Sequence, residues 1–376
     1  MQPQLKTSET YWLDRTHVLG KEFAKRSADY DRDAAFVKEN YDMLKEDRYF
    51  SAIIPVELGG EGVPFSEMCE IIRTIGQYCG STALALSMHQ HLLAANIWKY
   101  KKGQGGEAML RKVADKQLVL VSTGARDWLE SNGEVKATDG GYLISALKYF
   151  ASQSSVGDVL VTSAPYHDPE RGWEVLHFPV PFTSTGVTVM NDWYTMGMRG
   201  TGSNTVRLEN VFVPESAIVL RRPRGKFHPF WNVVLTVAMP LIMSAYVGVA
   251  EEAASIAVRH AKSNKSRKAH IPFLIGEMHN ELTAARVQLR DMVRICNEYD
   301  FQPLDCNGQD ILARKVNVAN ACIGTVSKAI GIVGGQSFYR SFGLERLFRD
   351  VQGANFHPLP EKDQQLFSGE YILNGD

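Results

Sequence analysis

The chain has 376 residues, a formal net charge of −1 and 44% hydrophobic residues. This length suits two or three domains with a packed core, and the balanced charge argues against a nucleic-acid-binding surface. No apolar run approaches the roughly 18 residues that cross a bilayer, and the polar start of the chain lacks a secretory core. We therefore expect a cytoplasmic protein with no nucleic-acid or membrane partner.

The five cysteines are scattered along the chain and include no CxxC pair. This pattern is typical of reduced, structural thiols in a cytosolic protein. It offers no set of zinc ligands, so no metal site is expected.

Three segments with different periodicity follow one another along the chain. From residue 7 to about 119 the apolar residues recur at helical spacing, and from there to about 220 they alternate with polar residues. Helical spacing returns from Phe227 onward. Three long helices are expected there, at 237–262, 272–299 and 310–333.

Clusters of Gly, Asp, Pro and Asn separate the strands of the middle segment. The strands are expected at 118–122, 142–151, 159–163, 174–180, 187–190 and 205–213. A block of strands between two helical blocks predicts an α+β protein. We expect an N-terminal helical domain at 1–119, a β-barrel domain at 120–220 and a C-terminal four-helix bundle at 221–376.

The most informative segment is 196–203, which has three glycines within six residues. Glycine lets the backbone turn sharply and approach a flat ligand, because no Cβ stands in the way. The turn also carries Arg199, Thr201 and Ser203, and an alternating apolar strand follows it up to Pro214. Taken alone, it is a Gly-rich loop before a strand, and most such loops only form turns.

This segment and its strand resemble the strand–loop–strand that ends the middle β-domain of the acyl-CoA dehydrogenase superfamily of flavoproteins. Further stretches are similar to that family in the same order: 58–62, 87–91, 148–153, 331–338 and 347–350. The resemblance extends from about residue 10 to 373. It implies the α–β–α layout of the family, a bound FAD, and a homodimer or homotetramer with the flavin held across subunits.

The resemblance assigns three side chains of the middle segment to the flavin. Phe150 and Ser152 are two residues apart on an expected strand, so they would project to one side as an apolar wall and a hydrogen-bond donor. Thr123 matches a flavin-contacting threonine, although the acidic residue and proline that usually follow it are absent. The structural alternative is a core phenylalanine beside a hydroxyl that bonds a neighbouring strand.

Two glycines near the C-terminus are further cofactor candidates. Gly334 and Gly335 would let backbone N–H groups approach a pyrophosphate. As the alternative, a Gly-Gly pair after a helix is a C-terminal cap. The Arg349–Asp350 pair that follows either closes the flavin site, as the resemblance implies, or forms a structural ion pair.

Trp193 and Arg199 flank the Gly-rich loop and are the candidate substrate-binding residues. The planar guanidinium of Arg199 suits a phosphate or an oxygen of the substrate. It would equally suit a carboxylate such as that of Glu209, with no chemical role.

The carboxylate base that the family uses is missing. Its usual position, counted from the Arg-Asp pair, is Pro358, and the position used by a subset of the family is Ala238. His357 and Glu361 stand close by, where prolines restrict the backbone, and are candidate catalytic residues. His357 titrates near neutrality and can act as a base. The alternatives are that His357 supports the turn and that Glu361 caps the last helix.

A second departure points to another branch of the superfamily. The flavin-binding Arg and Phe-Gly of the family are absent from residues 263–277, as in two-component flavin monooxygenases, whose reduced flavin arrives from a separate reductase. Those enzymes place histidines and a hydroxyl around the flavin, which His89, His91, Ser152 and His357 match. Because His89 and His91 lie about 200° apart on a helix, only one of them can face a common site.

Two enzyme functions follow from these observations. The first is FAD-dependent oxidation of the CH–CH bond of an acyl thioester, with His357 or Glu361 as the base and a separate electron acceptor. The second is a two-component monooxygenase that uses FMN or another reduced flavin and O2 on a small organic substrate. A binding or scaffolding protein that has lost its chemistry is the third alternative.

Overall fold

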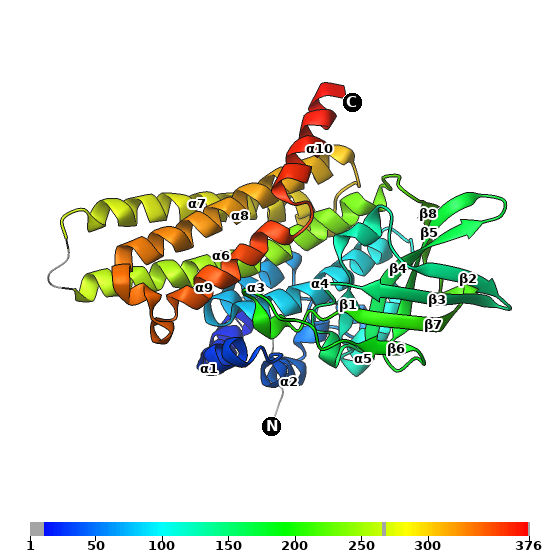
Figure 1. Cartoon of the computed structure of the whole chain (residues 1–376), viewed down its shortest axis with the longest axis horizontal. Helices are drawn as coiled ribbons and strands as arrows, with labels where there is room; N and C mark the ends of the chain where they lie inside the picture. Colours follow the sequence, from blue (N-terminus) through cyan, green and yellow to red (C-terminus); the bar gives the residue numbers. More distant parts are fainter. Residues whose placement is uncertain (1–10, 265–267, 375–376) are drawn as a thin grey trace.

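Helices from both ends of the chain pack beside a set of strands that lies at one end of the molecule in the computed structural model, which describes residues 11–264 and 268–374 (Figure 1). The α+β class and the order of helical, strand-rich and helical parts are confirmed. Residues 1–10, 265–267 and 375–376 of the predicted domains and loops lie outside the described residues.

The N-terminal part is a group of helices that packs on the first long C-terminal helix. Its elements are α1 (Tyr11–Asp33), α2 (Lys38–Glu46), α3 (Phe65–Tyr78), α4 (Gly80–Lys101) and α5 (Glu107–Lys116). Helix α4 is apolar on nearly every face because it lies against α3, against the C-terminal bundle and against the first strand.

The middle part forms two four-stranded sheets that share one apolar core. The strands are β1 (Leu120–Ser122), β2 (Glu134–Thr138), β3 (Gly141–Lys148), β4 (Val159–Asp168), β5 (Gly172–Pro181), β6 (Val187–Val189), β7 (Val206–Pro214) and β8 (Leu220–Pro223). One sheet has the order β1-β4-β5-β8 and the other β2-β3-β7-β6. The expected barrel thus takes the form of two packed sheets.

Sequence periodicity missed β2 and β8 and extended β3 too far. Strand β2 is polar and largely exposed, and β8 is short and carries two arginines, so neither shows clear alternation of apolar residues. Strand β3 ends at Lys148, because Phe150 adopts a left-handed backbone conformation with φ of 56°. The predicted strand 142–151 is therefore wrong in its last three residues.

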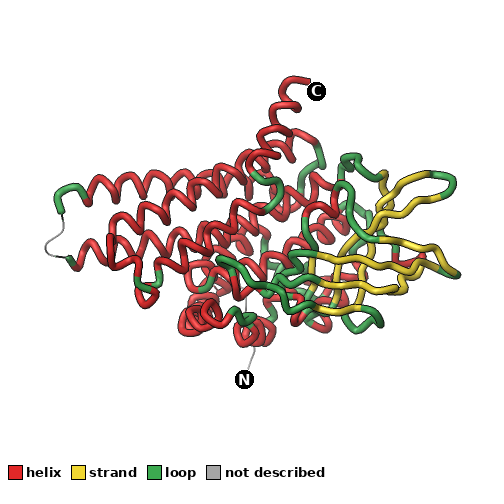
Figure 2. The backbone as a smooth tube through the Cα atoms, viewed as in Figure 1, coloured by secondary structure: helices red, strands yellow, loops and turns green. Residues whose placement is uncertain are grey.

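The C-terminal part contains three long helices, a short helix that lies along them and a last helix that projects from the bundle (Figure 2). These are α6 (Phe230–Ser263), α7 (Ile271–Cys296), α8 (Asp305–Val333), α9 (Leu344–Val351) and α10 (Glu361–Asn374). Figure 1 shows α6 and α8 running the length of the bundle, from the β-sheets to the opposite end.

By length and composition alone, α6 and the helical stretch 305–338 are long and apolar enough to cross a membrane. This corrects the expectation that no apolar run approaches that length. The most apolar window of α6 is wholly buried inside the protein, because α6 packs against α3, α4, α7 and α8. A core helix of a bundle meets the same test of length and composition.

Helices α3 and α6 approach each other backbone to backbone at two glycines. A Cβ atom added to Gly248 would lie 2.1 Å from the carbonyl oxygen of Arg73 and 2.9 Å from the Cα atom of Gly76. Neither helix can yield, because both are buried at this contact.

We therefore expect Gly248→Ala to lower the free energy of unfolding by roughly 1–3 kcal/mol. The matched control is Gly276→Ala in α7, where an added Cβ meets no atom within 4 Å and better helix propensity favours alanine. Thermal or denaturant unfolding of the two variants gives the comparison. Equal stability of both variants would contradict the close packing of α3 and α6.

Candidate functional site

The Gly-rich loop 196–203 is held where the helical parts meet the β-sheets. Its Gly200 carbonyl accepts from the backbone N–H of Val37, and its Thr201 carbonyl accepts from that of Gln153. The backbone N–H of Met198 donates to Oδ1 of Asp350 at 2.6 Å. The N-terminal helices, the β-domain and α9 therefore all fix this loop.

Three buried hydroxyl groups and a carbonyl form a row inside the loop. The Oγ atoms of Ser152 and Ser203 are 2.8 Å apart, and Oγ of Ser203 is 2.8 Å from the hydroxyl of Thr201. The Thr201 hydroxyl donates in turn to the carbonyl oxygen of Met198 at 2.8 Å. Ser152, a predicted cofactor residue, is thus joined to the hydroxyls of the Gly-rich segment.

Phe150 and Trp193 form an aromatic corner beside this row. Their ring centroids are 6.0 Å apart with planes at 80°, and the Trp193 indole donates to the carbonyl of Met198 at 3.3 Å. Phe150 is 62% exposed whereas Ser152 is buried. The expectation that both project to one side of a strand is therefore wrong, yet an exposed ring in a fixed corner suits contact with a flat apolar ligand.

Thr123 lies next to the aromatic corner. The backbone N–H of Gly124 donates to the carbonyl of Tyr149 at 3.1 Å, and a Cβ atom on Gly124 would lie 3.7 Å from the ring of Phe150. The structure thus places Thr123, Phe150 and Ser152, the predicted flavin residues, near Trp193, a predicted substrate residue; their binding roles stay predictions.

A buried carboxylate, Asp127, supports Thr123 from behind. Its Oδ2 atom accepts from the hydroxyls of Thr123 and Thr162, and its Oδ1 atom accepts from the ammonium of Lys148 at 3.0 Å. Lys148 is 1% exposed. Burial lowers the pKa of Lys148, and the charge and hydrogen bond of Asp127 oppose that change.

On the bundle side of the site His357 is hydrogen-bonded to a phenol, and His91 is its electrostatic neighbour. Nε2 of His357 shares a 2.7 Å hydrogen bond with the hydroxyl of Tyr246, which extends from α6. His91, on α4, lies near enough to lower the pKa of His357. Three elements distant in sequence therefore place two imidazoles and a phenol together.

Both imidazoles are held in the neutral form. Burial lowers the pKa of His91 to about 4, and burial together with the Lys315 ammonium and His91 lowers the pKa of His357. Burial also raises the pKa of Tyr246 well above its ordinary value, so its phenol keeps its proton. The cluster can hold or pass a proton without carrying a permanent charge.

His89 belongs to the core and not to this cluster. Its Nε2 atom bonds the carbonyl of Phe50 at 2.8 Å, and its Nδ1 atom accepts from the backbone N–H of Leu120 at 3.0 Å. With both ring nitrogens engaged by the backbone, His89 fastens β1 to α4. This corrects the pairing of His89 with the catalytic candidates.

Glu361 also stands apart from the cluster. It is the first residue of α10, and its carboxylate accepts from the side chains of Asn320 and Gln365 at the surface. The hydrogen bond from Asn320 is the main cause of its lowered pKa. The structure gives Glu361 the role of a helix-start residue, which was the alternative to catalysis.

Arg199 holds the Gly-rich loop to the N-terminal helices. Its guanidinium donates to the carbonyls of Thr195 and Asp31 at 2.8 and 3.3 Å. Its nearest carboxylate is Asp31, at 4.0 Å, and not Glu209, which lies beside Arg207. These contacts support a structural role and leave Trp193 as the better candidate for touching a ligand.

Gly334 and Gly335 lie at the end of α8. Gly334 has φ of 71° and its N–H donates to the carbonyl of Ile330, so it caps the helix. A Cβ atom on either glycine would meet no atom within 4 Å. The backbone here is therefore open to a ligand.

These two glycines are far from Thr123 within one chain. At one end of α6, Trp231 packs on Trp128 of the β-domain, with centroids 5.0 Å apart. At the other end, His260 packs on Phe342, which follows the glycines. The helix spans roughly 40 Å between these contacts at 1.5 Å per residue. One chain does not bring all the predicted cofactor residues together.

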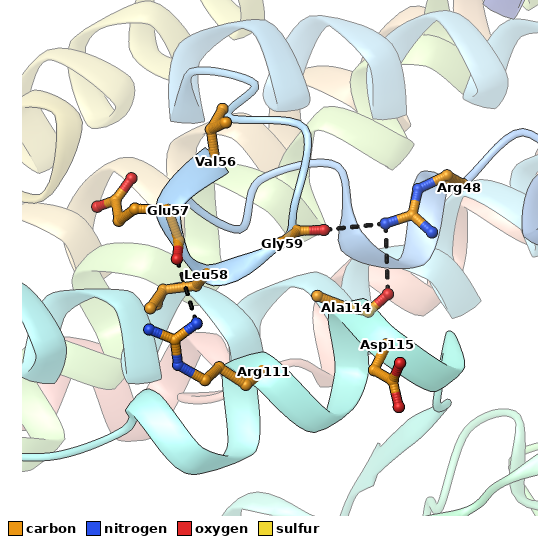
Figure 3. A pocket seen from close by; sticks show the side chains of 8 residues that line it. All are labelled: Arg48, Val56, Glu57, Leu58, Gly59, Arg111, Ala114 and Asp115. Atoms are coloured by element: carbon orange, nitrogen blue, oxygen red, sulfur yellow. Dashed lines mark hydrogen bonds between the residues drawn. The ribbon is translucent and has the colours of Figure 1, made fainter.

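A shallow hollow of about 630 Å3 lies elsewhere, between α5 and the short turn before α3 (Figure 3). Arg48 donates there to the carbonyls of Gly59 and Ala114, and Arg111 donates to the carbonyl of Glu57. These hydrogen bonds join backbone segments, and no candidate side chain lines the hollow. We assign it a structural role.

Comparison with known proteins agrees with this arrangement. The sequence model "Acyl-CoA dehydrogenase, N-terminal domain" matches residues 16–117, and "Acyl-CoA dehydrogenase, C-terminal domain" matches residues 232–357. The chain belongs to the acyl-CoA dehydrogenase family. It is thus a member of a family of flavoenzymes that includes dehydrogenases and monooxygenases.

Relatives with either chemistry align along almost the whole chain. The putative acyl-CoA dehydrogenase YdbM of Bacillus subtilis is 26% identical, over 94% of this chain and 93% of YdbM. The probable FMNH2-dependent monooxygenase SfnC of Pseudomonas putida is 23% identical, over 95% of this chain and 93% of SfnC. A structure of KijD3 in complex with FMN shares the fold, with a TM-score of 0.88 and 24% identity over 99% of this chain and 95% of KijD3.

This chain has no acidic residue at either position that the resemblance to the acyl-CoA dehydrogenase family assigns to the base. Ala238 lies in the buried part of α6, and Pro358 follows His357. The Arg-Asp pair does not form an ion pair with itself: Arg349 pairs with Asp31, while Asp350 holds the Gly-rich loop. Among the described residues, three kinds of group near this region can exchange a proton: the histidine–phenol cluster, the Asp350 carboxyl, whose pKa burial raises to about 6, and Lys315, whose pKa burial lowers to about 8.

Sequence reasoning missed Tyr246 and Asp127. Tyr246 places a hydroxyl within the long apolar run of α6. That polar group in an apolar helix is the sequence feature that could have singled it out. Asp127 lies just after Thr123, where the usual acidic residue and proline of the family are absent, and no motif singles it out. Its role depends on Lys148, 21 residues away, and no local pattern indicates that contact.

Proposed function

We propose that this protein is a flavin-dependent monooxygenase that receives reduced flavin from a separate reductase and acts with O2 on a small organic substrate. The observation that carries the proposal is the neutral cluster of His91, His357 and Tyr246 in a family member without an acid at position 238 or 358. Removal of an α-proton from a thioester calls for a base, and the family's carboxylate is absent.

The aromatic corner and the hydroxyls fit a flavin ring. Phe150 and Trp193 would form its apolar wall, and Thr123 and Ser152 would border its polar edge. FMN is our preferred cofactor over FAD, since a curated relative carries FMNH2 in its name. Bound reduced flavin would supply the two electrons by which one oxygen atom of O2 enters the substrate and the other leaves as water.

The residues of the chain handle the protons of this reaction. His357 and Tyr246 share a hydrogen bond and can exchange one proton between an imidazole and a phenol. His91 keeps Nε2 without a protein partner in the part of the chain that the structure describes, so this nitrogen can face the substrate or O2. His91 and Tyr246 are buried, which keeps bulk water away from these two groups.

Oxidation of an acyl thioester is the second candidate. The relative YdbM and two cyclohex-1-ene-1-carbonyl-CoA dehydrogenases among the curated relatives favour it. In this case His357 would take the α-proton, and FAD would remain oxidised until substrate binds. A homodimer or homotetramer and a cytoplasmic location are proposed with either function.

Anaerobic flavin titration followed by oxygen distinguishes the two functions. We expect the purified protein to bind reduced FMN at micromolar concentration and to consume O2 with transfer of oxygen to an organic substrate. Bleaching of bound oxidised flavin by an acyl-CoA would instead establish the dehydrogenase. Failure to bind FMN or FAD in either redox state would overturn both.

A further inference from the structure

The hydroxyl groups of the row in the Gly-rich loop all donate their hydrogen bonds in one direction. The Met198 carbonyl at the end of the row sets this direction. A carbonyl oxygen accepts hydrogen bonds and cannot donate. Since the Thr201 hydroxyl lies 2.8 Å from the carbonyl of Met198, the single proton of Thr201 is used there. The contact between Thr201 and Ser203, also 2.8 Å, therefore needs the proton of Ser203.

The same reasoning continues to Ser152. Because Ser203 gives its proton to Thr201, the 2.8 Å contact between Ser152 and Ser203 needs the proton of Ser152. In the reverse arrangement, Ser203 and Thr201 would face each other at hydrogen-bond distance with no proton between them. Ser152 therefore presents only lone pairs to a ligand.

The hydroxyl of Thr123 is also left as an acceptor only, because of a different set of hydrogen bonds. Its hydroxyl donates to Oδ2 of Asp127, and a carboxylate beside the Lys148 ammonium accepts only. Thr162 bonds both the same oxygen, at 3.1 Å, and the Thr123 hydroxyl, at 3.2 Å. Whichever hydroxyl donates in the second contact, the proton of Thr123 is used inside this network. Two independent networks leave the hydroxyl oxygens of Ser152 and Thr123 as acceptors.

We propose that these two acceptor-only hydroxyls make the site select reduced over oxidised flavin. The inference rests on the proposed function, in which Ser152 and Thr123 border the flavin ring. Oxidised flavin presents acceptors along its polar edge and a single ring N–H, at N3. Reduced flavin gains an N–H at N5, so an edge of acceptors matches the reduced ring better.

The test is the ratio of the dissociation constants for oxidised and reduced FMN. We expect the unmodified protein to bind reduced FMN at least about tenfold more tightly, the size of one hydrogen bond. Ser203→Ala removes the acceptor for Ser152 and frees its proton to donate. In this variant the dissociation constant for oxidised FMN divided by that for reduced FMN should fall roughly tenfold, chiefly because oxidised FMN binds more tightly.

Ser154→Ala is the matched control. Ser154 is buried in the same segment, but its hydroxyl donates to the carbonyl of Gly202 outside the row. The ratio of the dissociation constants for oxidised and reduced FMN should be the same in Ser154→Ala as in the unmodified protein. Ser152→Ala provides a second test variant, since it deletes one acceptor and should weaken binding of reduced FMN with little change for oxidised FMN.

The reduction potential of bound FMN is a separate readout. Tighter binding of the reduced form makes bound FMN easier to reduce than free FMN, and Ser203→Ala should reverse part of that shift. Flavin binding with no preference for the reduced form, or a ratio unchanged in both Ser203→Ala and Ser152→Ala, would overturn the inference and leave the proposed function standing. Absence of flavin binding in either state would overturn both.

Discussion

Replacing His357 with alanine is expected to lower turnover by roughly 10²–10⁴-fold, the usual contribution of a positioned acid–base group. The imidazole shares its hydrogen bond with Tyr246 at 2.7 Å, so the variant loses the proton-exchanging pair. The side chain is partly buried in the short turn before α10, so its removal should cost less stability than the loss of a fully buried core side chain. Steady-state kinetics with saturating reduced flavin, together with thermal unfolding, measure the two effects separately.

Two variants make this result specific. His357→Gln can keep a hydrogen bond to Tyr246 but cannot take a proton, so it should be almost as slow as the alanine variant. His279→Ala changes an exposed histidine of α7 and should leave turnover unchanged. Full activity of His357→Gln would show that the residue only positions Tyr246.

The pH dependence of the unmodified enzyme gives a further check on His357. Its surroundings lower the pKa of this imidazole, so the neutral form persists when pH falls through 6.5, the ordinary value for histidine. The activity that depends on neutral His357 should therefore not decline around pH 6.5. A decline centred there, absent from His357→Ala, would contradict the buried environment.

Replacing Asp127 with alanine is expected to lower the free energy of unfolding by roughly 3–5 kcal/mol, because it leaves a buried charge without its partner. Lys148 is 1% exposed and donates to Asp127 at 3.0 Å. Its other acceptors are neutral groups of Ser131 and Asn132. Denaturant unfolding of the flavin-free protein measures the loss.

A double variant identifies the cause. Asp127→Ala combined with Lys148→Met removes the charge together with its partner and should be clearly more stable than Asp127→Ala alone. Arg15→Met and Asp47→Ala, in a more exposed ion pair, should cost at most about 1 kcal/mol each if the pair acts as surface pairs do. Equal stability of the single and double Asp127 variants would refute the buried-charge argument.

Local periodicity was enough to predict the fold class and most of the strands. Strands β4, β5 and β7 have buried and exposed residues in near alternation or long apolar runs, and the long helices have apolar stripes. Strand β2 could not be found in this way because it is polar and largely exposed, and the end of β3 depends on the conformation of Phe150.

The candidate site was predicted in part. Thr123, Phe150 and Ser152, which the resemblance assigned to the flavin, lie near Trp193, which was predicted to touch the substrate; the binding roles of all four stay predictions. The division between His89 and His91 follows from helix geometry, but which of them belongs to the core depends on contacts with Phe50 and Leu120. Tyr246 could not be assigned, since its partner is 111 residues away.

The length of α6 has a consequence for how this enzyme would hold its cofactor. If Gly334 and Gly335 contact the same flavin as Thr123, they must come from a second copy, because α6 separates them within one. Cofactor occupancy would then rise with protein concentration by mass action. Dilution below the dissociation constant of the copies would release flavin even when every individual chain remains folded.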